Sequence, residues 1–199
     1  MSARRFSILA AVLLLATPAA AQFGGSDAHK FLSAIKDQKG QDVVDMLTGP
    51  GSSLVNVQDP GSGDTALDMV VRRGDTTYTR FLLQHGADPN IRNKQGATAT
   101  MIAVAENEES CLDILIQARA NVNIANDRGE TPLIRAVQLR NITMVHDLLA
   151  AGADPDQTDH IAGLSARAYA KRDTRSPVIA KMLADAPKVH ASASVGPSL

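Results

Sequence analysis

The chain has few of the residues that specialised sites require. Its 199 residues include one cysteine, no tryptophan, four phenylalanines and two tyrosines. A single cysteine excludes an intrachain disulfide and any metal site built from several cysteines. With so few aromatic rings, the chain has little with which to stack on bases or sugars.

The charge of the chain is balanced rather than of one sign. Lys and Arg number 20 against 21 Asp and Glu, which gives a net charge of −1. This balance gives no electrostatic reason to expect a nucleic acid or an anionic membrane as partner. The hydrophobic fraction of 44% is ordinary for a chain that buries a core. Length and composition together predict one compact domain or one short array of repeats.

The sequence also lacks the short motifs of common catalytic sites. It contains no G-x-S-x-G elbow, phosphate loop, dinucleotide fingerprint or zinc-binding H-E-x-x-H. We therefore predict no enzyme activity, no cofactor and no metal. The alternative is a redox accessory or an enzyme that acts through Cys111. Acidic residues flank this thiol and oppose formation of the thiolate, so we expect a half-buried structural cysteine.

The N-terminal segment has the pattern of an export signal. Two arginines precede an apolar run over residues 6–17, and small residues follow it. This arrangement is typical of a secretory signal peptide, here residues 1–21, cleaved between Ala21 and Gln22. The apolar run is short for a membrane span. We expect a mature bacterial protein without a membrane anchor that is periplasmic or secreted.

The remainder of the chain repeats itself at a fixed period. Gly63, Gly96, Gly129 and Gly163 begin related segments and are 33, 33 and 34 residues apart. A second motif, L-L-x-x-G-A-D-x-N in its fullest form, keeps the same spacing. Its copies lie at residues 82–90, 115–123 and 148–156. Two motifs in phase at one period indicate an array of repeated structural units.

Each copy carries the signals of two helices. A threonine whose hydroxyl can accept an unpaired backbone N–H precedes each first helix. These threonines are Thr65, Thr98 and Thr131. Gly86 and Gly152 follow the second helices, where a left-handed residue is favoured, so Arg119 in the same position is expected to be strained. Leu82, Leu115 and Leu148 give each second helix an apolar face, which only stacking of neighbouring units can bury.

The pattern G-x-T-P-L followed by L-L-x-x-G-A-D-x-N resembles the ankyrin repeat. The copy that starts at Gly129 matches best, and the resemblance covers about residues 28–186. The usual His after T-P-L is replaced in three copies, by Asp68, Met101 and Ile134. Thr100 stands where the family usually has Leu. The resemblance implies an all-α solenoid of stacked helix–turn–helix units with short hairpin turns.

We expect five units, the first and last of them degenerate caps. Their bounds are about 28–58, 59–92, 93–125, 126–159 and 160–186. Residues 22–27 form a short segment before the array. Residues 187–199 are small and polar, and we expect a disordered tail there.

The resemblance implies that a partner meets the hairpin tips and the exposed face of the first helices. Mapping by repeat position predicts a protein-binding set: Arg72, Arg92, Lys94, Gln95, Asp127, Arg128, Glu130, Arg135 and Gln138, with His160 last. Mixed charge of this kind suits a folded protein with complementary charge. The alternative is that these are ordinary solvated turn residues.

The resemblance and the export signal together predict a function class. We expect a monomeric, non-catalytic protein-binding module that acts as a periplasmic adaptor, a chaperone-like protein or an inhibitor of another protein. Besides the Cys111 hypothesis, the alternative is a secreted effector that binds host proteins.

Overall fold

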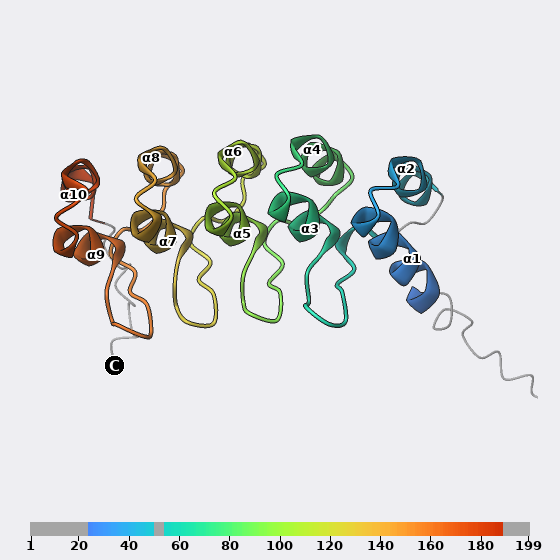
Figure 1. The fold of residues 1–199 in the computed structure, drawn as a ribbon, viewed down its shortest axis with the longest axis horizontal. Helices are drawn as coiled ribbons and strands as arrows, with labels where there is room; N and C mark the ends of the chain where they lie inside the picture. The colour runs from blue at the N-terminus through green and yellow to red at the C-terminus, as the bar shows by residue number, and fades with distance from the viewer. Residues whose placement is uncertain (1–23, 50–53, 189–199) are drawn as a thin grey trace, which may run out of the picture.

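The computed structural model describes residues 24–49 and 54–188, which form five helix pairs in a row (Figure 1). The first helices of the pairs are α1 (Gly24–Lys36), α3 (Ala66–Arg72), α5 (Ala99–Ala105), α7 (Pro132–Leu139) and α9 (Ala166–Arg172). The second helices are α2 (Gly40–Thr48), α4 (Thr76–Gln84), α6 (Glu109–Gln117), α8 (Ile142–Ala150) and α10 (Pro177–Asp185). A short 3-10 turn, η2 (Leu54–Asn56), follows the first pair.

The pairs form two layers of helices with hairpin loops on one side. First helices pack against first helices, and second helices against second helices, along the row. The loops between units project away from the second helices, past the layer of first helices (Figure 1). Within the described ranges the elements are helical and extended pairing is limited to two isolated bridges, so the prediction of an all-α solenoid is confirmed.

The first helices begin as the sequence predicts. The Thr65 hydroxyl accepts the Asp68 N–H at 3.2 Å, and Thr131 accepts the Ile134 N–H at the same distance. Thr98 caps α5 in the same way, and Pro132 occupies the first turn of α7. Each cap satisfies one of the N–H groups that a helix start leaves unpaired, worth about 1 kcal/mol.

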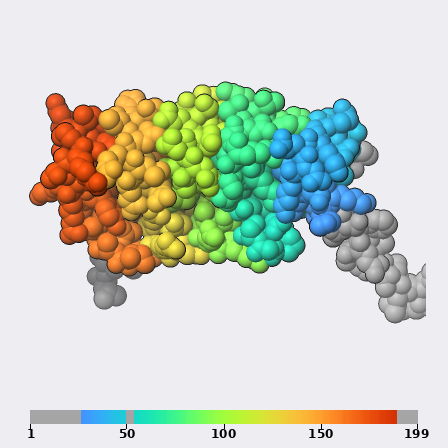
Figure 2. Space-filling model, in the orientation of Figure 1, coloured from blue at the N-terminus to red at the C-terminus, as the bar shows by residue number. Residues whose placement is uncertain are grey.

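The core follows the repeated apolar positions. Leu82, Leu115 and Leu148 are fully buried. Small residues at the ends of the first helices, such as Ala103 and Val104, are also buried and let neighbouring helices approach closely. Figure 2 shows the units as bands that touch along the whole row, which is how stacking buries faces that no single unit can bury.

Neighbouring hairpins are joined through their backbones. The Lys94 N–H donates to Ser62 O at 3.0 Å, and the two later pairs, Asp127 to Gln95 and His160 to Arg128, repeat this bond. Gly129 follows this contact with φ +74°, and a Cβ there would lie 2.8 Å from the His160 nitrogen. A glycine is therefore required where the next hairpin approaches.

Helix α1 begins earlier than predicted, Thr100 lacks a hydrogen-bond partner, and both ends of the chain lie outside the described residues. Helix α1 already begins at Gly24, inside the segment 22–27 that was expected to precede the array. The buried Thr100 hydroxyl has no hydrogen-bond partner, which makes this departure from Leu unfavourable. The predicted signal peptide, its cleavage site, and residues 189–199 of the expected tail lie outside the described residues.

Arg119 adopts the left-handed conformation that its repeat position requires. Its φ is +60°, where Gly86 and Gly152 have +86° and +89°. We expect Arg119→Gly to raise the free energy of unfolding by up to about 1 kcal/mol, because strain removed from the folded chain outweighs the entropy that glycine adds to the unfolded one. Urea unfolding followed by circular dichroism measures the change.

The matched control is Arg80→Gly inside α4, which should lower the free energy of unfolding by about 1 kcal/mol. If Arg119→Gly were as destabilising as Arg80→Gly, the left-handed strain would be refuted.

Candidate protein-binding groove

A groove runs between the hairpin loops and the first helices of units two to five. It consists of two hollows of about 530 and 240 Å³. The larger is formed by α5 and the loops before α5 and α7, and the smaller by α7, α9 and the loops before them. Arg128, Glu130 and Arg135 line both hollows, so the two adjoin at these residues and are together called the groove.

The structure brings the predicted binding residues together in this groove, except Arg92 and His160. The larger hollow is lined by Arg72, Lys94, Gln95, Asp127, Arg128, Glu130 and Arg135, and the smaller also by Gln138. Arg92 does not line either hollow but forms an ion pair with Asp127 at 2.8 Å. His160 stacks on the preceding hairpin through its backbone bond to Arg128. That these residues contact a partner stays a prediction.

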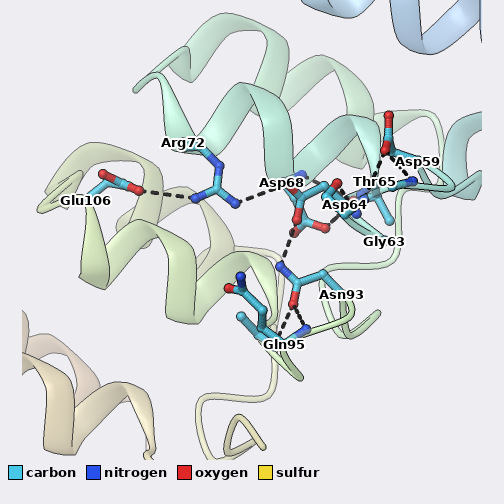
Figure 3. A network of polar contacts seen from close by, with 12 residues as sticks. Asp59, Gly63, Asp64, Thr65, Asp68, Arg72, Asn93, Gln95 and Glu106 are labelled. Atoms are coloured by element: carbon cyan, nitrogen blue, oxygen red, sulfur yellow. Dashed lines mark hydrogen bonds and ion pairs between the residues drawn. The ribbon is translucent and has the colours of Figure 1, made fainter.

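Arg72 is held inside a polar network that joins units two and three (Figure 3). Its guanidinium pairs with Asp64 and with Glu106, each at 3.2 Å. Asn93 of the next hairpin donates to the other oxygen of Asp64 at 2.7 Å. The side chain of Arg72 therefore links two repeats before any partner arrives.

A third carboxyl group, that of Asp68, lies beside this network, at the position where the family usually has His. Asp68 is only 1% exposed, and both the backbone N–H and the hydroxyl of Thr65 donate to it, at 2.8 and 3.0 Å. Burial raises the pKa of Asp68 to about 6, and the negative charge of Asp64 acts in the same direction. The hydrogen bonds from Thr65 oppose this shift in pKa.

Two further cations of the predicted set also have partners within the chain. Lys94 Nζ donates to the Pro60 carbonyl of the preceding hairpin. Arg92 donates to the Gly96 carbonyl at 3.1 Å, in addition to its ion pair with Asp127. Both side chains strengthen the contact between neighbouring hairpins.

Arg128 and Arg135 differ from these cations. Among the described residues, neither guanidinium has a hydrogen-bond or ion-pair partner. Arg135 is half-buried where the two hollows meet, and Arg128 is exposed at a hairpin tip. The neighbouring Glu130 accepts from Asn126 at 3.2 Å. The groove therefore holds two arginines whose donors are available to a ligand.

Sequence reasoning missed the end of the groove that belongs to the fifth unit. Ile161 is 77% exposed at the tip of the last hairpin, and Tyr169 on α9 donates to Asp159 at 2.5 Å. Asp159 also accepts the N–H groups that form this hairpin turn. Aligning Ile161 with Arg128, one repeat earlier, would have added it to the predicted set.

The lone cysteine does not resemble a reactive thiol. Cys111 is fully buried, not half-buried as expected, and its sulfur lies 3.8 Å from the Thr79 hydroxyl. Burial raises the pKa of the Cys111 thiol, and the charges of Glu108 and Asp75 raise it further. These observations oppose the hypothesis of a nucleophile or redox group at this position.

The comparison with known families agrees with the geometry. A family model described as ankyrin repeats, in three copies, matches residues 19–126 and 86–159. The chain belongs to the ankyrin-repeat family. The fifth unit of this ankyrin-repeat protein lies beyond the matched residues, yet it has the same helix pair as the others. Ankyrin repeats indicate a protein–protein interaction module.

Three relatives of this ankyrin-repeat protein match part of its chain. The chain is 31% identical over 84 residues to oxysterol-binding protein homolog 1 of Saccharomyces cerevisiae. The matched stretch covers 41% of this chain and 7% of that protein. It is 35% identical over 77 residues to the human 2-5A-dependent ribonuclease, and this stretch covers 39% of this chain and 10% of the ribonuclease. It is 32% identical over 89 residues to an ankyrin repeat-containing protein of Treponema pallidum, and this stretch covers 39% of this chain and 30% of that protein. The matched stretch spans less than a third of each relative.

In the part of the chain that the structure describes, no group of three or more His, Cys, Asp or Glu side chains is arranged to hold a metal ion. Over the same residues, no helix has the length and apolar character needed to cross a bilayer.

Proposed function

We propose that this ankyrin-repeat protein is an exported, non-catalytic adaptor that binds another protein through the groove. The observation that carries the proposal is geometric: binding residues chosen by repeat position, from units two to four, line two adjoining hollows. A rigid stack presents such a surface in a preorganised form, so little conformational entropy is lost when a partner binds.

The N-terminal sequence supports the part of the proposal that says the protein is exported. A basic start, a short apolar run and small residues before Gln22 are the features of a cleavable export signal. The adaptor then acts in the periplasm, as a chaperone-like or inhibitory partner of another exported protein. Onward secretion, to bind proteins of a host, is the competing outcome of the test below.

Export is tested by fractionating cells of the source bacterium that produce the full chain with a C-terminal affinity tag. We expect the periplasmic fraction to contain a protein whose N-terminal residue is Gln22. The same processed protein found only in the medium would support the secreted effector instead. An unprocessed chain that keeps Met1 in the cytoplasm would contradict export.

Binding is tested by pull-down of the tagged protein from that fraction after mild crosslinking. The test variant is Arg128→Ala with Arg135→Ala, because these side chains have no partner among the described residues whose loss would disturb the fold. Arg80→Ala with Arg119→Ala is the matched control, which removes two exposed arginines outside the groove. A protein retained by the native chain and the control but lost with the test variant supports the adaptor. Equal retention by all three places the interface elsewhere, and no specific protein at all contradicts the proposal.

A further inference from the structure

We infer that the end of the groove nearest the C-terminus binds a partner segment in which an Asp or Glu side chain lies next to an apolar side chain. The acid-binding end is defined here as Arg128, Arg135, Gln138, Ile161 and Tyr169. The inference rests on the proposed function, because it specifies the chemistry of the protein that the groove accepts.

The first observation is an excess of positive charge at this end. The smaller hollow shares Gln138 and Tyr169 with a neighbouring hollow of about 430 Å³ formed by the loops after α7 and α9. Together the two are lined by five arginines and three carboxylates. A local surplus of positive charge on a chain with a net charge of −1 favours an acidic ligand at this place.

The three carboxylates already have donors within the chain. Asp159 accepts from Tyr169 and from the turn that contains Ile161. Asp173 pairs with Arg140 at 2.7 Å and with Arg175 at 3.0 Å. Glu130 accepts from Asn126 at 3.2 Å. None of the three forms an ion pair with Arg128 or Arg135, so these guanidinium groups keep their donors for a ligand.

The chemistry of these donors selects the ligand group. A guanidinium offers parallel N–H donors whose geometry matches the two oxygens of a carboxylate. Arg135 is half-buried, so a carboxylate that reaches it is partly shielded from water and the ion pair is stronger than one on an open surface. The groove therefore binds an acidic side chain most strongly where its two hollows meet.

The second observation is an exposed apolar side chain, that of Ile161, at the tip of the last hairpin. The backbone bonds between hairpins put Ser62, Gln95 and Arg128 at equivalent tips, and Ile161 is the next position in this series. A single exposed apolar residue is common on protein surfaces. Here, however, it lines the same hollow as Arg135 and the Tyr169 ring, at a position that is polar in the other hairpins. In a bound segment, an apolar side chain next to the acidic side chain would cover both Ile161 and the Tyr169 ring.

The opposite end of the groove differs in how many of its cationic donors are available to a ligand. Arg72, Arg92 and Lys94 each have partners within the chain, so a ligand would have to displace an existing contact to use them. The available donors of Arg128 and Arg135 and the exposed side chain of Ile161 all lie toward the fifth unit. The acidic segment is therefore assigned to that end of the groove.

The test uses a display library of random twelve-residue peptides selected on the immobilised full chain. We expect enriched peptides to carry Asp or Glu next to Leu, Ile, Val or Phe. The affinity of one synthetic enriched peptide is then measured by fluorescence anisotropy against purified variants. Arg135→Gln should weaken binding at least about tenfold, and Arg135→Lys should weaken it less, because the charge remains and the fork of donors is lost.

Matched controls separate binding from folding. Arg80→Gln removes an exposed arginine on α4 and should leave the affinity within about twofold of the native value, the size of change expected for a surface charge outside the contact. Ile161→Ser should weaken binding several-fold, whereas Ile142→Ser, which changes a residue 47% exposed on α8, should not. Circular dichroism confirms that all five variants, including the two at Arg135, are folded.

Three results would overturn the inference: no enriched peptide, enriched peptides without a carboxylate, or equal affinities for the native chain and Arg135→Gln. Displacement of the peptide by a short single-stranded oligonucleotide at equal concentration would show that the arginines bind phosphate instead. A partner captured in the pull-down despite any of these results leaves the proposed adaptor function standing and rejects only the acidic segment.

Discussion

Leu148→Ala is expected to lower the free energy of unfolding by about 2–5 kcal/mol, because the change leaves a cavity in the stack. Leu148 is fully buried on α8, a helix that packs against α7 within its unit and against α6 and α10 in the neighbouring units. The lost contacts therefore weaken the fourth unit and both of its interfaces. Urea unfolding followed by circular dichroism at 222 nm gives the difference in free energy.

The control removes the same atoms from a more exposed leucine. Leu139 is 39% exposed at the end of α7, so Leu139→Ala should cost less than about 1 kcal/mol. Hydrogen exchange should show the largest loss of protection in α6, α8 and α10 for Leu148→Ala. A loss of stability below about 0.5 kcal/mol would mean that Leu148 does not lie in the core.

The fold was predictable because each unit depends mainly on its nearest neighbours. One aligned repeat gives the positions of caps, core and turns in the others. The left-handed conformation of Arg119 illustrates this: its chemistry does not favour φ of +60°, but the glycines one repeat before and after it predicted the conformation. The burial of Cys111 was underestimated, because this residue on α6 packs against α4 of the preceding unit, where its sulfur lies 3.8 Å from the Thr79 hydroxyl.

The site was predictable only as a set of positions. Repeat alignment shows which residues share a face, but it does not show which cation pairs with which carboxylate. Arg72 and Glu106 are 34 residues apart, and Arg92 and Asp127 are 35 apart. Both separations are close to one repeat, so a search for opposite charges at that spacing would have found these pairs. Ile161 was missed because it is apolar where the earlier hairpins have Ser62, Gln95 and Arg128, so a search for polar and charged tip residues passed over it although its repeat position is the same.

Asp68→Asn is expected to stabilise the protein at neutral pH and to flatten its stability between about pH 4 and pH 6. The folded-state pKa of Asp68 is raised to about 6 from an ordinary value of 3.8, chiefly by burial. Between these values the folded chain binds more protons than the unfolded chain, so the native protein loses stability as pH rises through this window. By pH 7 the cost of the buried charge is about 2–3 kcal/mol.

The amide removes that charge while keeping a hydrogen-bond acceptor. The Asn carbonyl oxygen accepts from Thr65 as the Asp68 carboxylate does, and no negative charge remains beside Asp64. Asp59 does not obscure the result, because its pKa is lowered to about 2 by hydrogen bonding to Lys36 and to backbone N–H groups, and its contribution is lost only as pH falls below 3.8.

The measurement is urea unfolding of the native chain, Asp68→Asn and a control, Asp113→Asn, at intervals from pH 4 to pH 7.5. Asp113 is exposed on α6, so its substitution should leave the pH profile unchanged. The gap in stability between Asp68→Asn and the native chain should be small near pH 4 and widen as pH rises. Parallel profiles over this range would show that Asp68 ionises normally in the folded protein, and that the carboxyl group in place of the usual His imposes no cost on the second repeat.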